Sequence, residues 1–234
     1  MVEAAPKVNI REFQSGDQDR VYYIWANGLK EACWNGALAW RRSWSSRLLV
    51  GACLAAAAMC RLLGHGSVLL PLCLATTSGA VYFIGPLLVY SSLNRKMQAI
   101  IAKSEMRDIR TNWASHNSRA FLVADLAGQV VGATAVHLGS VDYPSEAPVT
   151  EDDLQGSVAS IFRMTIDSSV RRAGIGSKLL GAAEEYAKAR GYQSMLLHTA
   201  NQAAINFYAA NKYMSLGMYM YGGLPSMRLQ KQLC

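Results

Sequence analysis

The chain has 234 residues, of which 51% are hydrophobic and 17% are charged, and its formal net charge is +7. This length fits one domain of about 180 residues with an inserted apolar segment, and no stripe of basic and aromatic residues predicts a nucleic-acid partner. The five cysteines are dispersed and three lie in the apolar segment, so the sequence predicts neither a disulfide framework nor a metal site.

Two elements are predicted before the apolar segment. Residues 8–13 are expected to form a strand, and residues 17–29 carry the periodicity of an amphipathic helix. Ser15-Gly16-Asp17 supplies the helix start, because short polar side chains accept hydrogen bonds from the unpaired N–H groups of a first turn. We assign both elements to residues 1–40, the N-terminal part of a domain that resumes further along the chain.

Residues 48–93 form a long apolar block. Basic residues lie on both sides of it, namely Arg41, Arg42, Arg47, Arg95 and Lys96. One helical crossing of a bilayer needs about 20 residues, so the block has room for two helices with a turn at Gly64-His65-Gly66. We therefore predict a membrane-embedded helical hairpin over residues 41–96, with both flanks on the cytosolic side and membrane lipids as partners. Residues 1–47 contain no apolar segment typical of a cleavable signal, so the block itself is expected to target the membrane.

The rest of the domain is predicted over residues 97–234. A long helix over residues 94–113 leads away from the block, and a hairpin of strands over residues 119–125 and 130–137 follows it. Residues 139–156 form an acidic loop, which is either a solvated loop or a lid over the substrate.

An apolar strand is predicted over residues 158–166. Strict alternation along this strand places two sets of side chains on opposite faces, Ile161, Arg163 and Thr165 on one and Phe162, Met164 and Ile166 on the other.

The strand is followed by Arg171-Arg172-Ala173-Gly174-Ile175-Gly176, which opens a helix over residues 177–190. A loop with two glycines lets consecutive backbone N–H groups point into one concavity, and the helix N-terminus adds a partial positive charge, so a pyrophosphate fits there. The spacing matches neither G-x-x-x-x-G-K-[ST] nor G-x-G-x-x-G. Gly191 is expected to end the helix in a left-handed conformation, and a strand over residues 194–199 completes a β-α-β crossover.

These segments resemble two motifs of the GNAT superfamily of N-acetyltransferases. Arg171, Gly174 and Gly176 match its R/Q-x-x-G-x-G/A loop, and residues 201–208 match its N-x-x-A-x-x-h-Y helix, in which h is hydrophobic. The resemblance implies acetyl-CoA as co-substrate, with no metal. The residues that it implies as contacts are Met164, Ile166, Arg171, Arg172, Ala173, Gly174, Ile175, Gly176, Ser177, Asn201 and Tyr208.

Two residues of the second motif have specific implied roles. Asn201 is expected to contact the pantetheine arm, and Tyr208 to face the thioester sulfur and protonate the leaving thiolate, unless Tyr208 is only a core aromatic. The sequence departs from the family in one place, since Lys212 precedes Tyr213 where the family usually has glycine. Asn211 is expected to take the left-handed turn instead.

The whole chain resembles the membrane-embedded, camello-type branch of this superfamily, which includes aspartate N-acetyltransferase and cysteine-S-conjugate N-acetyltransferase. The runs Arg163-Met164-Thr165-Ile166-Asp167-Ser168 and Glu105-Met106-Arg107-Asp108-Ile109 favour the aspartate branch. The resemblance implies an α/β fold, with a mixed sheet and flanking helices interrupted by the hairpin. It also implies an integral membrane protein, in the endoplasmic reticulum, with the catalytic domain facing the cytosol.

The implied reaction is direct transfer. A neutral amine attacks the thioester carbonyl, whose oxygen is polarised by a backbone N–H near Met164 or Ile166. A base must first deprotonate the ammonium group. His198 and His137 are candidates, because the ordinary pKa of histidine suits the role, and water is the default. Ser160 stands where the aspartate branch has glutamate.

Arg163 is predicted to bind a substrate carboxylate or, alternatively, to pair with Asp167 or an acid of the loop over residues 139–156. Three hypotheses for function follow. The leading one is an N-acetyltransferase whose partner is a small amino-acid-like amine acceptor, such as aspartate or a related carboxylate. The second is an enzyme that acetylates lysines or N-termini of membrane or secretory-pathway proteins, and the third is a non-catalytic membrane module that binds acyl-CoA.

Overall fold

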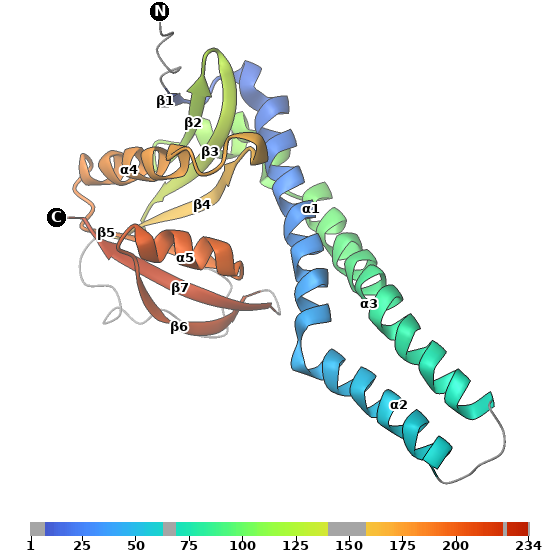
Figure 1. The fold of residues 1–234 in the computed structure, drawn as a ribbon. Coiled ribbons are helices and arrows are strands. Elements are labelled where there is room, and N and C mark those ends of the chain that lie inside the picture. The colour runs from blue at the N-terminus through green and yellow to red at the C-terminus, as the bar shows by residue number, and fades with distance from the viewer. Residues whose placement is uncertain (1–7, 63–68, 140–157, 222–223, 234) are drawn as a thin grey trace, which may run out of the picture. The chain divides into compact units, whose positions relative to one another are not determined.

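The computed structural model describes residues 8–62, 69–139, 158–221 and 224–233 (Figure 1). The chain divides into two compact units. The sheet unit consists of Met1–Gly28 and Ser104–Cys234, and the helical unit consists of Leu29–Lys103. The helical unit covers a longer stretch of the chain than the hairpin predicted over residues 41–96, because its helices continue past the apolar block on both sides.

The described part of the sheet unit contains a seven-stranded mixed sheet with the order β1-β2-β3-β4-β5-β7-β6. Its strands are β1 (Val8–Glu12), β2 (Arg119–Leu126), β3 (Gln129–Leu138), β4 (Val158–Ile166), β5 (Ser194–Thr199), β6 (Met214–Tyr221) and β7 (Leu224–Gln232). β4 and β5 pair in parallel, and the other neighbours pair antiparallel. This mixed sheet confirms the α/β class predicted from the sequence.

The predicted hairpin between β2 and β3 is confirmed, with a shorter turn than expected. Ala127 and Gly128 have φ angles of 54° and 83°, and Leu126 pairs directly with Gln129. Two successive residues with positive φ form the tight turn whose twist matches that of antiparallel strands. The side chain of Asp125 supports the turn by accepting a hydrogen bond from the Gly128 N–H at 2.7 Å.

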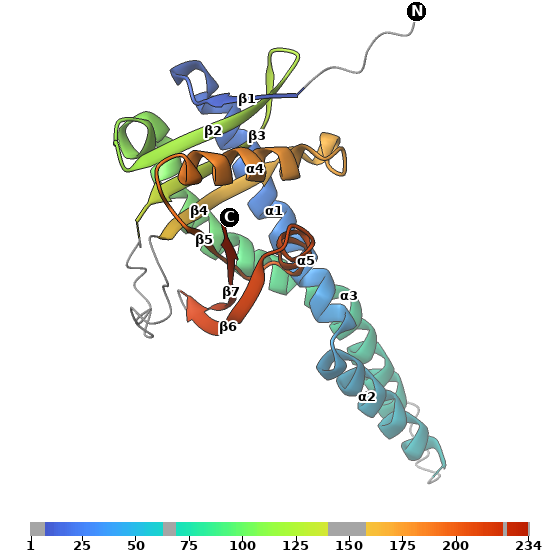
Figure 2. The same ribbon diagram turned by 90° about the vertical axis from the view of Figure 1, so that its left-hand side faces the viewer.

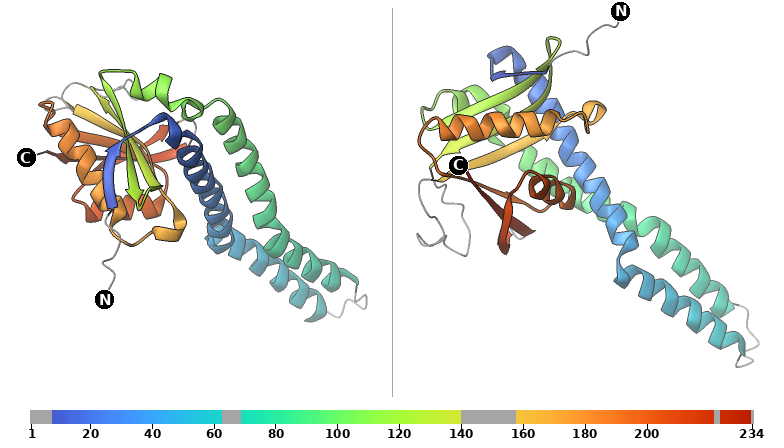
Figure 3. Two further views of the ribbon diagram at one scale, coloured as in Figure 1. Left: turned by 90° about the horizontal axis from the view of Figure 1, so that it is seen from above. Right: turned by 60° about the vertical axis from the view of Figure 1, so that its left-hand side comes forward.

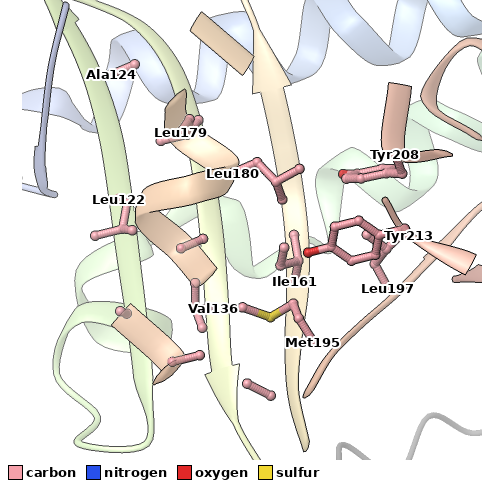
Figure 4. Packing of buried hydrophobic residues seen from close by; sticks show 14 of the residues in the cluster. Leu122, Ala124, Val136, Ile161, Leu179, Leu180, Met195, Leu197, Tyr208 and Tyr213 are labelled. Atoms are coloured by element: carbon pink, nitrogen blue, oxygen red, sulfur yellow. The ribbon is translucent and has the colours of Figure 1, made fainter. Parts of the chain in front are cut away.

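Helices cover both faces of the sheet (Figures 2 and 3). α4 (Ile175–Lys188) packs on strands β1 to β4, and α5 (Gln202–Ala210) contacts β5. On the α4 face, Leu179 and Leu180 are fully buried against side chains from β2, β3, β4 and β5 (Figure 4). Burying a leucine side chain contributes about 1.5–3 kcal/mol, so this cluster stabilises the crossover between β4 and β5.

The opposite face of the sheet is covered by the first part of α1 (Gln18–Arg42) and by two short turns, η2 (Glu105–Arg107) and η3 (Arg110–Ala114). Their buried side chains are Val21, Ile24, Trp25, Met106, Ile109 and Trp113. The Trp113 ring packs on Phe162 of β4 with 5.6 Å between centroids. Gln18 ties the two segments together, because its side chain donates to the Met106 carbonyl and accepts from the Ile109 N–H.

Two predicted helix boundaries were wrong. The first helix was expected to end at residue 29, but α1 continues to Arg42, and Cys33 and Ala37 are buried on one face of this continuation. Gly28 lies inside the helix, where a side chain would meet the Thr165 hydroxyl at 3.3 Å. The helix predicted over residues 94–113 ends at Ala102. The Ser104 side chain accepts a hydrogen bond from the Met106 N–H and so starts the separate turn η2.

The helical unit contains the rest of α1 together with α2 (Trp44–Leu62) and α3 (Leu69–Ala102), which pack on each other. The Trp34 and Tyr90 rings meet edge to face at 5.5 Å. Its exposed large apolar side chains are Trp34, Leu48, Leu54, Met59, Leu62, Tyr82, Phe83, Ile84, Leu87 and Leu88. None of the described helices combines the length and the apolar character needed to cross a bilayer. The predicted turn over residues 64–66 and most of the predicted acidic loop lie outside the described residues.

Candidate active site

The loop between β4 and α4, residues 168–174, is named the pyrophosphate loop here. It ends at Gly174, whose φ is +75° and where an added side chain would meet no atom within 4 Å. Glycine is therefore needed for the backbone conformation and not for space. α4 begins at Ile175, two residues earlier than the predicted start at residue 177, because Gly174 already serves as its cap. Gly191 has φ of +83°, which confirms its predicted left-handed conformation, but α4 ends at Lys188, two residues before the predicted end at residue 190.

Backbone donors are concentrated at the start of α4. Its ladder begins with the bond from the Lys178 N–H to the Gly174 carbonyl, so the N–H groups of Ile175, Gly176 and Ser177 have no acceptor within the helix. The helix end also carries a partial positive charge. Together with the open space at Gly174, these donors fit the pyrophosphate of coenzyme A.

The two arginines of the pyrophosphate loop are exposed. Arg171 donates from Nε to the Ile166 carbonyl at 3.1 Å, which ties the loop to the end of β4. Arg172 has φ of +66°, a conformation that a non-glycine residue adopts at some energetic cost. Arg171, Arg172, Ala173, Gly174, Ile175, Gly176 and Ser177 are thus brought together in one segment, and their contacts with acetyl-CoA stay a prediction.

β4 contains a bulge at Arg163, and this bulge corrects the predicted faces of the strand. Arg163 has φ of +53°, and the pairing with β3 shifts between Ala133 and Ala135. The extra residue breaks strict alternation. Ile161 therefore shares the α4 face with Met164 and Ile166, whereas Phe162 lies with Arg163 and Thr165 on the face covered by α1.

β4 and β5 separate after Ser160, shortly before the bulge. Their parallel pairing covers only Val158–Ser160 and Ser194–Leu196, while β4 stays paired with β3 up to Ile166. Asp167 donates its N–H to Val131 of β3 at 2.8 Å. Because successive N–H groups of a strand point to opposite sides, those of Met164 and Ile166 point to the side where β4 and β5 separate. These two donors are placed to polarise a carbonyl oxygen.

Tyr208 lies on α5 beside this separation. Its hydroxyl donates to the Met164 sulfur at 3.4 Å, and its ring meets that of Tyr213 at 5.5 Å (Figure 4). Burial raises the pKa of Tyr208, so the phenol stays protonated at neutral pH. Tyr208 is therefore both a core aromatic, as its burial shows, and a phenol adjacent to the donors of β4.

Asn201 is the N-cap of α5. Its side-chain oxygen accepts a hydrogen bond from the Ala203 N–H at 2.9 Å, and the residue is exposed. The amide nitrogen takes no part in the cap and is available to donate to a ligand carbonyl. The left-handed turn after α5 falls at Lys212, with φ of +70°, whereas Asn211 has φ of −94°. The expectation for Asn211 was therefore wrong, because its side chain instead donates to the Phe207 carbonyl.

The two histidines lie in environments that weaken them as bases. Burial, with the positive charge of Arg228 opposite it on β7, lowers the pKa of His198 to about 4. Burial also lowers the pKa of His137, with a further contribution from the charge of Arg119. A base works best when its pKa lies near the working pH. Water thus remains the default proton acceptor, and the catalytic role of His198 stays a prediction.

Arg163 points to the α1 face of the sheet. Its Nε and Nη2 both donate to Oε1 of Glu105 at 2.8 Å, and its guanidinium lies 5.7 Å from the Trp25 ring centre. Asp167 pairs with Arg20 instead, at 2.6 Å, so the alternative of an Arg163–Asp167 pair was wrong. Nη1 of Arg163 is outside the bonds to Glu105, and one third of the side chain is exposed.

Sequence reasoning did not identify Glu105 or Arg20 as neighbours of the site. Glu105 belongs to the run Glu105-Met106-Arg107-Asp108-Ile109, which resembles the aspartate branch. This resemblance was the signal that could have identified Glu105 as a neighbour of the site. Burial works to raise the pKa of Glu105, but the charge of Arg163 and several hydrogen bonds outweigh it, so the pKa lies below its ordinary value. No pattern in the sequence distinguishes Arg20. Among the described residues, no cluster of three His, Cys, Asp or Glu side chains could hold a metal ion.

Comparisons with known proteins agree with this geometry. Residues 87–213 match the model of the acetyltransferase (GNAT) family. N-acetylaspartate synthetase of Danio rerio is 27% identical over 94% of this chain and 70% of that protein. The probable N-acetyltransferase camello of Xenopus laevis is 26% identical over 87% of this chain and 84% of that protein. For N-acetyltransferase family 8 member 3 of Rattus norvegicus, also 26% identical, the match spans 59% of this chain and 58% of the relative.

Solved structures share the fold. The PaiA N-acetyltransferase of Thermoplasma acidophilum, solved in complex with coenzyme A, superposes with a TM-score of 0.55 and 13% identity. The match covers 97% of this chain and 99% of that one. An acetyltransferase of the GNAT family from Staphylococcus aureus gives a TM-score of 0.50, also at 13% identity and over 97% of this chain and all of that one. The arrangement of strands and helices is therefore one that other acetyltransferases use.

Proposed function

Because this chain belongs to the GNAT family of acetyltransferases, we propose that it transfers the acetyl group of acetyl-CoA to the amine of a small amino-acid-like acceptor that carries a carboxylate. The chain is an acyltransferase, and acetyl-CoA is its co-substrate. The acceptor class rests on one observation: Arg163 is held by Glu105 and Trp25 with Nη1 outside the ion pair. A guanidinium fixed in this way can bind one more carboxylate without reorganising.

The proposed chemistry uses the residues on both faces of β4. The neutral amine attacks the thioester carbonyl, a C–N bond forms, and the C–S bond breaks. The N–H groups of Met164 and Ile166 stabilise the charge on the carbonyl oxygen, and the Tyr208 phenol gives its proton to the departing sulfur. The proton released by the amine passes to water, and water returns a proton to Tyr208, so the phenol is restored for the next cycle. No covalent intermediate on the enzyme is required.

The acceptor assay measures thiol release from acetyl-CoA with purified full-length protein. The panel contains aspartate and glutamate, their amides asparagine and glutamine, S-substituted cysteines, polyamines and lysine peptides. We expect turnover with a dicarboxylic amino acid and little with its amide, since only the former offers a second carboxylate. The double variant Arg171→Ala with Gly174→Glu, which disrupts the pyrophosphate loop, is the blank. Turnover only with peptides would favour the protein-modifying hypothesis, and tight coenzyme A binding without any turnover would favour a non-catalytic module.

Arg163→Gln tests the acceptor contact directly. We expect the KM for the dicarboxylic acceptor to rise about tenfold to a hundredfold, the value of one or two hydrogen bonds to a charged group. The KM for acetyl-CoA should stay the same. Arg190→Gln removes an arginine whose side chain contacts only its own helix turn at Tyr186, and it serves as the control for lost positive charge. An unchanged acceptor KM in Arg163→Gln would remove this role.

We also propose that the helical unit is embedded in a membrane, that of the endoplasmic reticulum, with the sheet unit on the cytosolic side. The support is the gathering of exposed apolar side chains on α2 and α3, because soluble surfaces rarely carry large contiguous apolar patches. Replacing Phe83, Leu87 and Leu88 with serine should reduce recovery of the protein with membranes. The control replaces Met214, Leu216 and Met218, three exposed apolar residues of β6, and should not reduce it. Equal recovery of both variants would contradict the proposal.

Localisation and topology need separate measurements. Co-fractionation with endoplasmic reticulum markers tests the organelle. Protease treatment of intact microsomes tests the side, since a cytosolic sheet unit would be digested without detergent. Cleavage of the hairpin turn only after detergent would indicate a full double crossing, whereas labelling of the turn from the cytosolic side would indicate a re-entrant hairpin.

A further inference from the structure

Asp167 is held from two directions at the point where β4 leads into the pyrophosphate loop. Its Oδ1 accepts hydrogen bonds from the N–H and the hydroxyl of Ser169 at 3.0 and 2.8 Å. Its Oδ2 accepts one from Nη2 of Arg20 at 2.6 Å. The Asp167 carbonyl also accepts from the Val170 N–H at 3.2 Å. One carboxylate therefore connects the first turn of the loop to α1.

Arg20 makes a second contact that fixes its position. Its Nε donates to the Val130 carbonyl of β3 at 3.0 Å, and the next carbonyl along β3, that of Val131, accepts the Asp167 N–H at 2.8 Å. The guanidinium also lies 5.6 Å from the centre of the Tyr23 ring. Arg20 thus joins α1, β3 and the end of β4 at one place. This junction fixes the position of Asp167 and therefore the point at which the pyrophosphate loop begins.

The charge of Asp167 would otherwise oppose the function of the loop. Hydrogen bonds from Ser169 lower the pKa of Asp167, with a smaller contribution from Arg20, so the carboxylate is ionised at neutral pH. Only 14% of its side chain is exposed, which limits screening by water. A carboxylate at the entrance of the loop adds negative charge to the segment that is expected to bind a phosphate, and like charges repel each other. The guanidinium at 2.6 Å offsets this repulsion while leaving the hydrogen bonds to Ser169 in place.

We propose that Arg20 is a positioning residue for acetyl-CoA. It acts through Asp167, holding the pyrophosphate loop in the conformation that presents the N–H groups of Ile175, Gly176 and Ser177, and neutralising the carboxylate at the loop entrance. It acts as a positioning residue, because its Nε and Nη2 donate to the Val130 carbonyl and to Asp167 and so join α1 to the start of the loop. The proposal concerns the co-substrate alone and does not depend on which amine is the acceptor.

The test compares Arg20→Ala and Arg20→Lys in the full-length protein. We expect Arg20→Ala to raise the KM for acetyl-CoA, and the dissociation constant of coenzyme A measured by calorimetry, by about threefold to tenfold, since the pair is partly exposed. The kcat at saturation should stay within about twofold. Arg20→Lys should recover part of the affinity, because it keeps the charge and loses one of the two bonds. Arg190→Ala, which removes an equal charge at the far end of α4, should change neither constant.

A double-mutant cycle separates positioning from simple stabilisation. Asp167→Asn keeps an oxygen for Ser169 and removes the charge that Arg20 neutralises. If Arg20 acts through Asp167, then Arg20→Ala should weaken coenzyme A binding less in the Asp167→Asn background than in the wild type. A lowered unfolding temperature with unchanged coenzyme A affinity in both Arg20 variants would overturn the proposal, and so would fully additive effects. If Arg20→Ala does not fold, the affinity of Arg20→Lys decides.

Discussion

The Tyr208 hydroxyl donates a hydrogen bond to the sulfur of Met164, a residue that also carries one of the two backbone donors on the open side of β4. A thioether is a weak acceptor, so the phenol is oriented without being strongly engaged. A thiolate formed at this place would be a much better acceptor. The contact therefore keeps the phenol buried, protonated and aimed at the position of the leaving group.

Replacing Tyr208 with phenylalanine should lower kcat by about a hundredfold to ten-thousandfold, the usual contribution of general acid catalysis, with little change in coenzyme A affinity. Steady-state kinetics and calorimetry on the same preparation measure the two effects. Phe207→Leu on the same helix, which alters an aromatic without a hydroxyl, controls for packing. Unchanged turnover in Tyr208→Phe would leave the residue with a packing role only.

Gly176 and Gly181 form a matched pair on α4. A methyl group at position 176 would lie 3.2 and 3.3 Å from two atoms of the Phe207 ring, whereas at position 181 it would meet nothing within 4 Å. Gly176→Ala should therefore push α4 and α5 apart, cost about 1–3 kcal/mol of stability and weaken coenzyme A binding. Gly181→Ala should stabilise the protein by about 0.5–1 kcal/mol through helix propensity. Denaturant unfolding with a coenzyme A titration distinguishes them, and equal effects would argue against the close contact.

Lys212 adopts a left-handed backbone with φ of +70°, so Lys212→Gly should increase the stability of the sheet unit. Glycine removes the steric cost of the left-handed backbone, and this gain exceeds the stability lost through the greater flexibility of the unfolded chain by about 0.5–1 kcal/mol. Asn211→Gly provides the opposite case, because Asn211 has negative φ and its side chain donates to the Phe207 carbonyl at 2.8 Å. It should lose about 1 kcal/mol. Urea unfolding followed by circular dichroism measures both, and a destabilised Lys212→Gly would contradict the reasoning.

His198 should make stability depend on pH between about pH 4 and 6.5. The folded protein protonates this imidazole only near its lowered pKa of about 4, whereas the unfolded chain protonates it near 6.5. In that window the unfolded state binds more protons, so lowering the pH favours unfolding. The full shift corresponds to about 3 kcal/mol, and partial access to water reduces this to about 1–2 kcal/mol.

His198→Gln tests both the linkage and the predicted catalytic role. The variant should lose less stability than the wild type between pH 7 and pH 4, as measured by chemical denaturation at each pH. Its kcat/KM should rise with pH in the same way as in the wild type, because the acceptor amine and not His198 then sets the profile. Loss of an inflection near pH 4 in the variant would instead restore His198 as the base.

Features that depend only on residues adjacent in the sequence could be predicted from it. The turn at Ala127-Gly128 and the left-handed Gly191 require particular backbone angles, and glycine at the end of an apolar pattern indicates them. The end of α1 could not be predicted, because Gly28 in the sequence is equally consistent with a helix stop and with close packing. The structure resolves this through Thr165, which is far away along the chain.

The acceptor side of the site was harder for the same reason. The faces of β4 depend on the bulge at Arg163, and a bulge is a property of the pairing with β3 and not of either strand alone. The ion pair Arg163–Glu105 joins residues that are 58 positions apart. No periodicity encodes such partners. The co-substrate side, built from one continuous loop and helix, could therefore be described more fully in advance than the acceptor side.

The insertion of the helical unit between Gly28 and Ser104 has a consequence for synthesis on the ribosome. β1 pairs with β2, and Val8 faces Leu126, so the first strand has no partner until 118 further residues have been made. At about 5–20 residues per second this delay is roughly 6–24 s. Loop closure over a longer chain costs little free energy, since each doubling adds only about 0.6 kcal/mol. The insertion therefore prolongs the time for which the nascent N-terminal strand is unpaired far more than it destabilises the finished protein.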